Sequence, residues 1–211
     1  MHRLLLFGWF LTLGLFAGTV SAAPEVTRTR LAANESQVEF AAGRWEFEES
    51  TGAFFSLNDG TFRPQINYAV QTVRLGAMLS NPHGSGVLAG NFELLVEALG
   101  GAIFQGPGDA LAGGDVIVRY NFVQPGARLV PYLEGGFGGI YSDISDSPSE
   151  TLLGSKVNFL EQATLGVRSR INQKWSLILQ ATYYHMSNAG LTSRNSGLDS
   201  FGGTAGLRYL F

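Results

Sequence analysis

Apolar and polar residues alternate with a period of two along most of the chain after about residue 36. This alternation is typical of β-strands whose two faces meet different surroundings, and turn residues separate the alternating segments. The pattern predicts eight strands, at 37–47, 64–78, 87–104, 113–123, 130–142, 156–171, 174–187 and 199–211.

The last two predicted strands show the alternation most clearly. From 175 to 183 the odd-numbered positions are apolar, and the even-numbered positions between them are polar except for Ile178. From 201 to 211 the odd-numbered positions are again mostly apolar, whereas Ser200, Thr204 and Arg208 occupy the other face. Each strand therefore presents one apolar face and one polar face.

Two architectures produce such strands. A soluble β-sandwich directs the apolar faces inward, whereas a membrane barrel directs them outward to lipid. The connections favour the barrel, because short turns at one end and long loops at the other are typical of outer-membrane barrels. Compact connections lie near 79–86, 124–129 and 171–174, and longer ones lie near 48–63, 143–155 and 188–198.

Aromatic residues support the same architecture. They gather near strand ends, as a girdle at the membrane interface requires. The residues of this predicted girdle are Trp45, Phe47, Tyr120, Phe122, Tyr141, Trp175, Tyr183, Tyr184 and Tyr209. The final "YLF" resembles the terminal aromatic signature of bacterial outer-membrane barrels. Since a closed barrel also leaves no backbone group unpaired in lipid, we predict an all-β fold, an eight-stranded antiparallel transmembrane β-barrel.

The barrel interior is expected to be filled by side chains, because eight strands close around too little space for a channel. Inward-pointing Arg168 and Arg208 would need carboxylate partners, for which Glu134 and Asp115 are candidates. A role in solute transport is therefore not favoured.

The N-terminus has the pattern of a secretory signal peptide. "MHR" supplies a positive start, "LLLFGWFLTLGLFAGTV" an apolar core, and "VSAA" small residues at a cleavage position after Ala22. The alternative, a membrane-anchoring helix, is disfavoured because small residues and Pro24 follow the apolar run. The predicted organisation is a signal peptide at 1–22, a periplasmic lead at 23–36 and the barrel at 37–211, with the short turns in the periplasm and the long loops outside.

Composition excludes several functions. A formal net charge of −3 with 15% charged residues does not suit nucleic acid binding. The absence of cysteine excludes disulfides, thiolate metal sites and cysteine nucleophiles. His83, in a turn-rich connection, is interpreted as solvated, and the acidic loop residues Asp143, Asp146 and Glu150 either bind a divalent cation or are simply solvated. No metal site and no cofactor is predicted, since no His or carboxylate cluster has convincing ligand spacing.

One short stretch, "ATYYHMSNAGL", carries candidate chemistry. His185 and Ser187 are two apart on a predicted strand, so they lie on the same face about 7 Å apart at Cα. Histidine is suited to take a proton near neutral pH, and serine needs such a base to act as a nucleophile. Asp199 opens the next strand and is the candidate acid that would orient the imidazole ring.

The parity of these positions predicts where the site lies. His185, Ser187 and Asp199 share the odd-numbered, apolar faces of their strands, so they would converge on the lipid-facing surface at the outer-leaflet end. Polar groups cost little free energy at that depth. A site there would meet lipid head groups. The alternative is that these residues only mark where the strand leaves the bilayer.

The segments "HMSNAGL" and "NSGLD", followed by a closing strand that ends in "YLF", resemble the C-terminal signature of the PagL family. These are outer-membrane lipid A 3-O-deacylases, also called acyloxyacyl hydrolases. "PYLEGGFGGIY" and "NFLEQATLGVRSRINQKWSL" are similar to the family as well, so the resemblance covers roughly residues 130–211.

The resemblance implies a role for each matching residue. His185 matches the general base and Ser187 the nucleophile, while Asn188 and Gly190 match the oxyanion-stabilising position. Asp199 stands where the family has glutamate, which is one methylene longer, so its reach to His185 depends on the strand register.

The leading hypothesis is thus an outer-membrane serine esterase that removes an ester-linked acyl chain, by resemblance the 3-O hydroxyacyl chain, from lipid A in the outer leaflet. Two alternatives remain: a non-catalytic small barrel with an adhesion or structural role, and a periplasmic β-sandwich that binds a ligand. The sequence does not distinguish a monomer from a homodimer.

Overall fold

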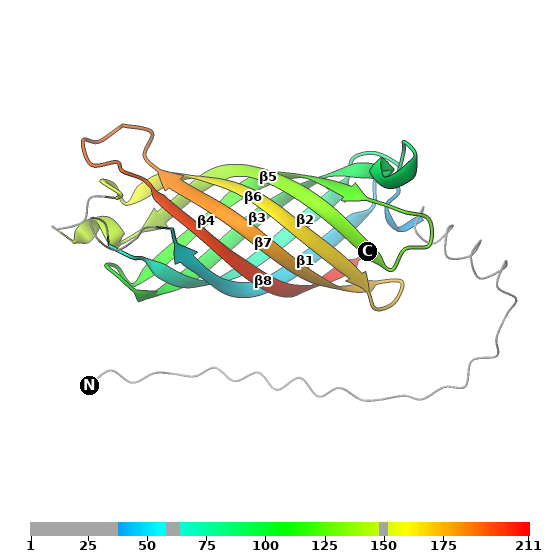
Figure 1. Ribbon diagram of the computed structural model, residues 1–211, viewed down its shortest axis with the longest axis horizontal. Helices are drawn as coiled ribbons and strands as arrows, with labels where there is room; N and C mark the ends of the chain where they lie inside the picture. The colour runs from blue at the N-terminus through cyan, green and yellow to red at the C-terminus, as the bar shows by residue number, and fades with distance from the viewer. Residues whose placement is uncertain (1–37, 58–63, 148–151) are drawn as a thin grey trace, which may run out of the picture.

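Eight antiparallel strands close into one barrel in the order in which they follow one another along the chain (Figure 1). The computed structural model describes residues 38–57, 64–147 and 152–211. The strands are β1 (Trp45–Ser56), β2 (Asn67–Met78), β3 (Gly90–Gln105), β4 (Ala110–Phe122), β5 (Leu129–Ser142), β6 (Val157–Arg170), β7 (Trp175–Ser187) and β8 (Leu198–Leu210). β1 pairs with both β2 and β8, which closes the sheet. The prediction of an eight-stranded antiparallel barrel is confirmed.

The connections lie at the two opposite ends of the barrel (Figure 1). We call one end the long-loop end; it carries the connections 57–66, 106–109, 143–156 and 188–197. The other, the short-turn end, carries the connections 79–89, 123–128 and 171–174 and the C-terminal Phe211. The predicted contrast in length holds only in part, because 79–89 is long enough to contain a 3₁₀ turn, η1 (Gly86–Leu88), and 106–109 is short.

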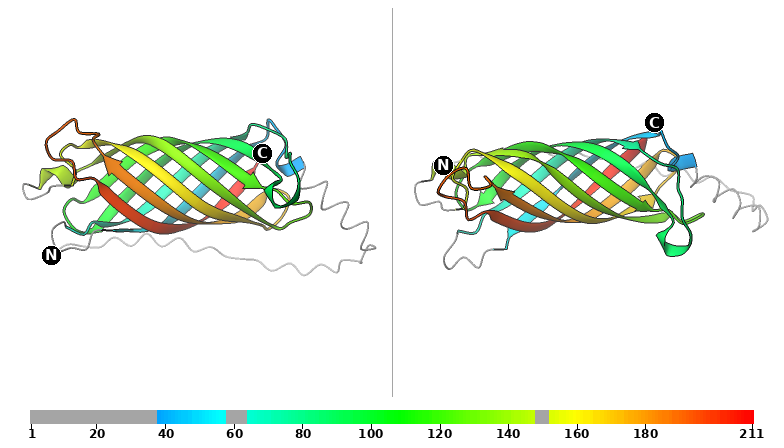
Figure 2. Two further views of the ribbon diagram at one scale, coloured as in Figure 1. Left: turned by 45° about the horizontal axis from the view of Figure 1, so that its top comes forward. Right: turned by 90° about the horizontal axis from the view of Figure 1, so that it is seen from above.

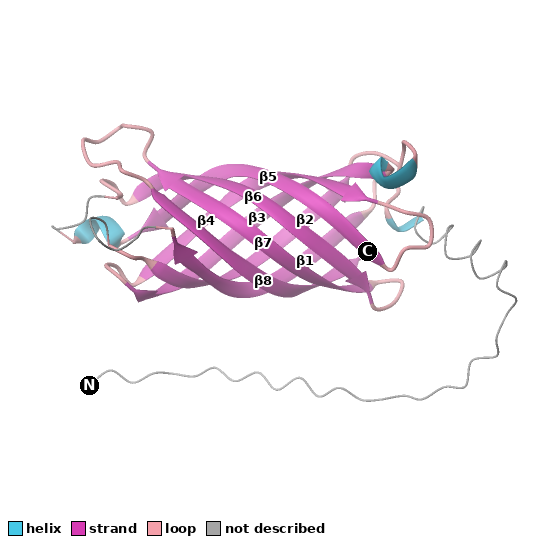
Figure 3. Ribbon diagram, viewed as in Figure 1, coloured by secondary structure: helices cyan, strands magenta, loops and turns pink. Residues whose placement is uncertain are grey.

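Besides the strands, the described residues contain only short helical pieces, among them η1 and η2 (Ile144–Asp146), which lie beyond the strand ends at the two ends of the barrel (Figure 3). No helix in the described part of the chain has the length and apolar character needed to cross a membrane. The predicted signal peptide and periplasmic lead lie outside the described residues.

The barrel has a polar interior and an apolar exterior. In β7, Trp175, Leu177 and Leu179 are exposed on the outer surface, whereas Ser176 and Gln180 are buried inside. β8 follows the same rule. This arrangement is the reverse of a soluble protein and is what a barrel wall in lipid requires. The predicted directions of the two strand faces are therefore confirmed.

Buried arginines and carboxylates form one network inside the barrel. Arg119 is at its centre: its guanidinium bonds Glu48 at 2.7 and 2.8 Å and Glu134 at 2.5 Å, and it also contacts Glu46 and Glu93. Charged groups in such a setting are tolerated because each is paired and hydrogen-bonded. The network ties β4 to strands on the opposite side of the barrel.

The predicted partners of two interior arginines are wrong. Arg168 and Arg208 both bind Glu46, at 2.8 and 2.7 Å, rather than Glu134 or Asp115. Alternation in a strand shows which side chains point inward, but partners across the barrel also depend on their height along the axis. That height is set by strand tilt and stagger, which the alternation does not contain.

Apolar side chains fill the interior at the long-loop end. This apolar plug is a cluster of buried residues from all eight strands and from the loops at that end, packed in part through aromatic contacts. Its members are Phe54, Ile66, Tyr68, Val70, Leu99, Leu111, Ile140, Ile144, Leu152, Leu153, Leu160, Tyr184, Met186 and Leu198. Tyr184 thus points inward and packs on Phe54 at 4.6 Å, so its assignment to the interfacial girdle is wrong.

Seven of the eight predicted strands agree with the structure to within three residues at each end. The first does not: Val38 and Glu39 are helical, turns follow, and β1 begins only at Trp45. The polar stretch "EEST" at 48–51 falls in the predicted loop 48–63, but it belongs to β1, in which Glu48 points into the barrel and binds Arg119. Polar residues on an inward face therefore mimic a loop in the sequence.

Candidate active site

His185 and Asp199 face each other across the β7–β8 ladder on the outer surface of the barrel. His185 Nδ1 lies 2.7 Å from Asp199 Oδ1, and the two side chains are 32% and 36% exposed. Because directly paired residues have close Cβ atoms, the aspartate reaches the ring although it is one methylene shorter than glutamate. A carboxylate only accepts, so Nδ1 carries the proton and Nε2 is left to act as a base.

A third residue, Tyr183, holds the same carboxylate oxygen. Its phenol donates to Asp199 Oδ1 at 2.5 Å. Tyr183 lies two residues before His185 on the same outward face of β7. From the sequence, Tyr183 was predicted only as a girdle residue, although its odd-numbered position beside His185 is a signal that could have placed it in the site.

Ser187 is the last residue of β7 and shares the outward face of His185. It is half-buried and pairs with Phe159 of β6. Its hydroxyl makes no hydrogen bond with the described residues. The structure therefore brings a histidine, its acid and an unengaged serine together on one strip of the barrel wall.

The even-numbered neighbours fix this strip from inside. Tyr184 and Met186 point inward and are almost fully buried in the apolar plug. Glu161 of β6 pairs with His185 on the side opposite Asp199 and is exposed. His185 thus has a carboxylate residue on each side, and within the described residues its hydrogen bond goes to Asp199.

Asn188 organises the loop that follows the serine. Its Nδ2 donates to Thr192 Oγ1 at 2.7 Å and to the Arg194 carbonyl at 3.1 Å, and its Oδ1 accepts the Gly190 N–H at 3.1 Å. Ala189 and Gly190 both have positive φ, 52° and 80°, a conformation rare for alanine. The two residues predicted to stabilise an oxyanion are therefore bonded to the loop itself.

Gly197 lies against the histidine ring. A Cβ built on Gly197 would come within 3.0 Å of His185 Cε1, and its φ of +75° already disfavours other residues. Its N–H donates to the Leu152 carbonyl at 3.0 Å, which joins the two loops 143–156 and 188–197. The role of Gly197 could not be predicted from the sequence, because its close approach to the ring exists only once the loop has folded back.

The other candidates do not form a second site among the described residues. His83 bonds through its backbone to Gly90 at the short-turn end. Asp143 accepts the N–H groups of Asp109 and Ala110, and Asp146 pairs with Lys156 at 2.8 Å; Glu150 lies outside the described residues. Slight burial raises the pKa of Asp143, but the two N–H groups outweigh it and the net pKa is lowered. In residues 38–57, 64–147 and 152–211 no group of three potential ligands is arranged for a metal ion.

Comparison with known proteins connects this geometry with a family. The family model described as lipid A 3-O-deacylase (PagL) matches residues 87–208, which is more than half of the chain and includes the whole site. The chain belongs to the PagL family. Family membership indicates a hydrolase that deacylates lipid A and is located in the outer membrane.

Solved structures support the fold. The outer membrane enzyme PagL shares 19% identity with a TM-score of 0.52, covering 74% of this chain and 97% of that one. Neisserial surface protein A shares 13% with a TM-score of 0.55, covering 79% and 97%. The N-terminal β-barrel domain of Pseudomonas aeruginosa OprF shares 13% with a TM-score of 0.52, covering 81% and 99%. A search among curated proteins gave no match.

Proposed function

We propose that this PagL family member is a serine esterase that removes the 3-O hydroxyacyl chain of lipid A, with Ser187, His185 and Asp199 as its triad. The observation that carries the proposal is the 2.7 Å contact between His185 and Asp199 beside an unengaged serine on the same outward strand face. The 3-position is inferred from the description of the family.

The proposed reaction begins with proton transfer. His185 Nε2 takes the Ser187 proton as the serine oxygen attacks the ester carbonyl, while Asp199 stabilises the imidazolium that forms. The tetrahedral intermediate collapses when the imidazolium protonates the ester oxygen of the sugar. The sugar then leaves with a free hydroxyl, and an acyl-enzyme remains. Water, deprotonated by His185, then attacks the acyl-enzyme and releases the fatty acid.

The oxyanion is assigned to Asn188 and Gly190. The Gly190 N–H follows Ser187 closely in the chain and is held in a tight turn by Asn188 Oδ1. In the transition state this N–H would exchange its bond to Asn188 for the developing negative charge. The exchange is favourable because a charged acceptor forms a stronger hydrogen bond than the neutral amide oxygen of Asn188.

The proposed orientation gives the site access to its substrate. With the short-turn end in the periplasm, the long-loop end faces outward and the site lies at the outer-leaflet interface. The triad is on the outer surface of the barrel, so lipid A would reach it by lateral diffusion in the membrane. The filled interior offers no competing route among the described residues.

Mass spectrometry of lipid A incubated with the folded protein in detergent tests the proposal. The wild type is expected to release one hydroxyacyl mass, and Ser187→Ala to lose at least about three orders of magnitude in rate. Ser169→Ala is the matched control, since Ser169 lies on the outward side of β6 toward the short-turn end. Intact lipid A after wild-type incubation, with several lipid A types, would leave the non-catalytic barrel as the answer.

A further inference from the structure

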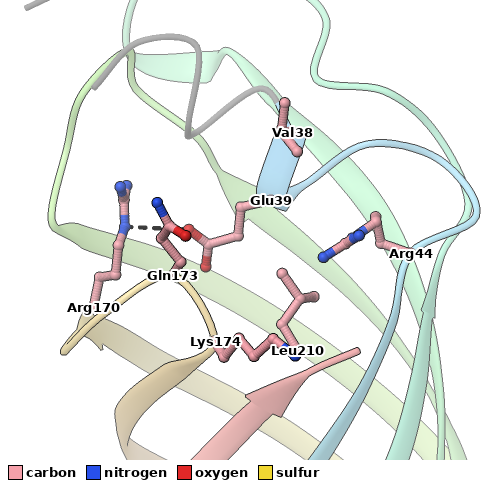
Figure 4. A pocket seen from close by; sticks show the side chains of 7 residues that line it. All are labelled: Val38, Glu39, Arg44, Arg170, Gln173, Lys174 and Leu210. Carbon is pink, nitrogen blue, oxygen red and sulfur yellow. Dashed lines mark ion pairs between the residues drawn. The ribbon is translucent and has the colours of Figure 1, made fainter. Parts of the chain in front are cut away.

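A pocket of about 280 Å³ lies at the short-turn end (Figure 4), at the opposite end of β7 from His185. It opens between the turn 171–174, the end of β8 and the residues that lead into β1. Its lining residues are Val38, Glu39, Arg44, Arg170, Gln173, Lys174 and Leu210. Three of them carry a positive charge and one a negative charge.

The single carboxylate of the pocket is already fully engaged. Glu39 Oε1 lies 2.6 Å from Arg208 Nη1, and Glu39 Oε2 lies 3.2 Å from Arg170 Nε. Glu39 therefore shares one negative charge between two arginines. It has no oxygen left to neutralise the remaining cations that line the pocket.

Arg44 and Lys174 are those remaining cations. The Arg44 side chain points into the pocket (Figure 4), and its Nε is buried and makes no hydrogen bond with the described residues. Lys174 Nζ bonds only a neutral group, the Tyr209 hydroxyl at 3.1 Å. A buried guanidinium N–H without an acceptor costs free energy, which an anion in the pocket would recover.

The surroundings indicate the depth of the pocket in the membrane. Lys174 lies 5.4 Å from the centre of the Tyr209 ring, and Tyr209 packs edge-to-face on Trp175 and Phe211. Such an aromatic cluster marks the level of lipid head groups. The exposed turn that carries η1 extends from the barrel at the same end (Figure 2) and contributes no residue to the lining of the pocket.

We propose that this pocket binds a phosphate group, supplied either by the head group of an anionic phospholipid in the adjoining leaflet or by free phosphate. Arginine and lysine are the side chains that recognise phosphate, and Arg44 would donate from its unpartnered Nε while Lys174 contributes a second charge. The proposal is independent of the deacylation and does not involve the triad.

Binding is measured on the full folded protein in an uncharged maltoside detergent. Native mass spectrometry counts bound phosphatidylglycerol, with diacylglycerol of the same acyl chains as the phosphate-free comparison, and calorimetry measures inorganic phosphate. Arg44→Gln is expected to weaken phosphatidylglycerol binding by about tenfold or more. Arg128→Gln, an exposed arginine at the same end but outside the pocket, is expected to change it little.

The outcomes separate the two sources. Preference for phosphatidylglycerol over inorganic phosphate, lost in Arg44→Gln, supports a lipid head group. Binding of inorganic phosphate with the same dependence on Arg44 supports free phosphate. Equal binding by Arg44→Gln and Arg128→Gln, or equal uptake of diacylglycerol, overturns the proposal. Heat-modifiable gel mobility verifies folding, and Lys174→Gln repeats the test at the second cation.

Discussion

Asp199 is the residue on which the proposed site converges, because one of its oxygens accepts from both His185 and Tyr183. The tyrosine fixes the carboxylate, and the carboxylate fixes the ring. An aspartate is long enough for this role since it lies directly opposite the histidine. The methylene by which it differs from glutamate is thus offset by strand register.

Asp199→Asn is expected to lower kcat by about four orders of magnitude, because an amide at this position favours the wrong imidazole tautomer. Asp199→Glu is expected to lose less, since it keeps the charge but has to fold its longer chain between paired strands. Rates of acyl release from lipid A measure both. Glu161→Gln, on the other side of His185, is the control; if it proved as damaging as Asp199→Asn, the assignment of the acid would be wrong.

Tyr183→Phe removes one donor to Asp199 while it keeps the ring on the outer surface. We expect kcat to fall by about tenfold with little change in KM, because the phenol positions the acid and does not contact the reacting ester. Tyr141→Phe makes the same change on an exposed tyrosine of β5 and should leave both constants unaltered. A change in KM alone for Tyr183→Phe would instead indicate a role in lipid binding.

At the scale of residues, the sequence predicted which side chains share a face of a strand but not the hydrogen bonds that fix them in place. Parity placed His185, Ser187 and Asp199 on the outward side, and the β7–β8 register agrees. Parity could not predict that the Asn188 side-chain amide donates to its own loop, since these hydrogen bonds depend on how the loop folds. The contacts within a folded loop follow no regular spacing in the sequence, so a periodic pattern cannot predict them.

At the scale of elements, the β7–β8 hairpin and its loop form the site together. The loop returns over the histidine at Gly197, where left-handed backbone and close packing coincide. Only glycine meets both demands. The loop therefore sets the position of the ring as much as the strand does.

Gly197→Ala tests this role of the loop. The added methyl group would lie 3.0 Å from His185 Cε1, which is too close, so the imidazole ring would have to move. Activity is therefore expected to fall by at least about tenfold. Backbone strain of about 1–2 kcal/mol would accompany the change. Gly43→Ala carries a similar φ of +82° but has nothing within 4 Å of the added methyl, so it should show strain alone. Equal activity of the two variants would rule out the ring contact.

Strand periodicity predicted most of the fold because the two sides of a barrel wall are chemically different along every strand. It failed at β1, where inward Glu48 was assigned to the loop 48–63 because the arginine that it binds, Arg119, lies far away along the chain. The alternation places Tyr184, an even-numbered residue of β7, on the inward face; its assignment to the interfacial girdle followed its aromatic character and not its position.

At the scale of the whole molecule, the barrel is held by charges across its interior. Arg119 alone joins Glu48 on β1, Glu93 on β3 and Glu134 on β5. These strands lie on different sides of the wall, so the network resists changes in the cross-section. The proposed site on the outer surface is supported by this frame.

Arg119→Gln would leave several buried carboxylates without their cation. The free energy of unfolding is expected to fall by about 3–5 kcal/mol, as for other buried charges that lose a partner. Urea titration in lipid vesicles, followed by heat-modifiable gel mobility, measures the change. Arg128→Gln, on the exposed short-turn end, should unfold like the wild type; an equally stable Arg119→Gln would mean that the network contributes nothing net.

The residues of the proposed site span only Tyr183 to Asp199, so one hairpin contains them all. Selection can therefore act on this hairpin separately from the rest of the chain. The remaining strands have only to span the membrane and fill the interior, which leaves their sequences freer to change. Recombination could transfer such a hairpin from one small barrel to another and so introduce the proposed site into a barrel that lacked it.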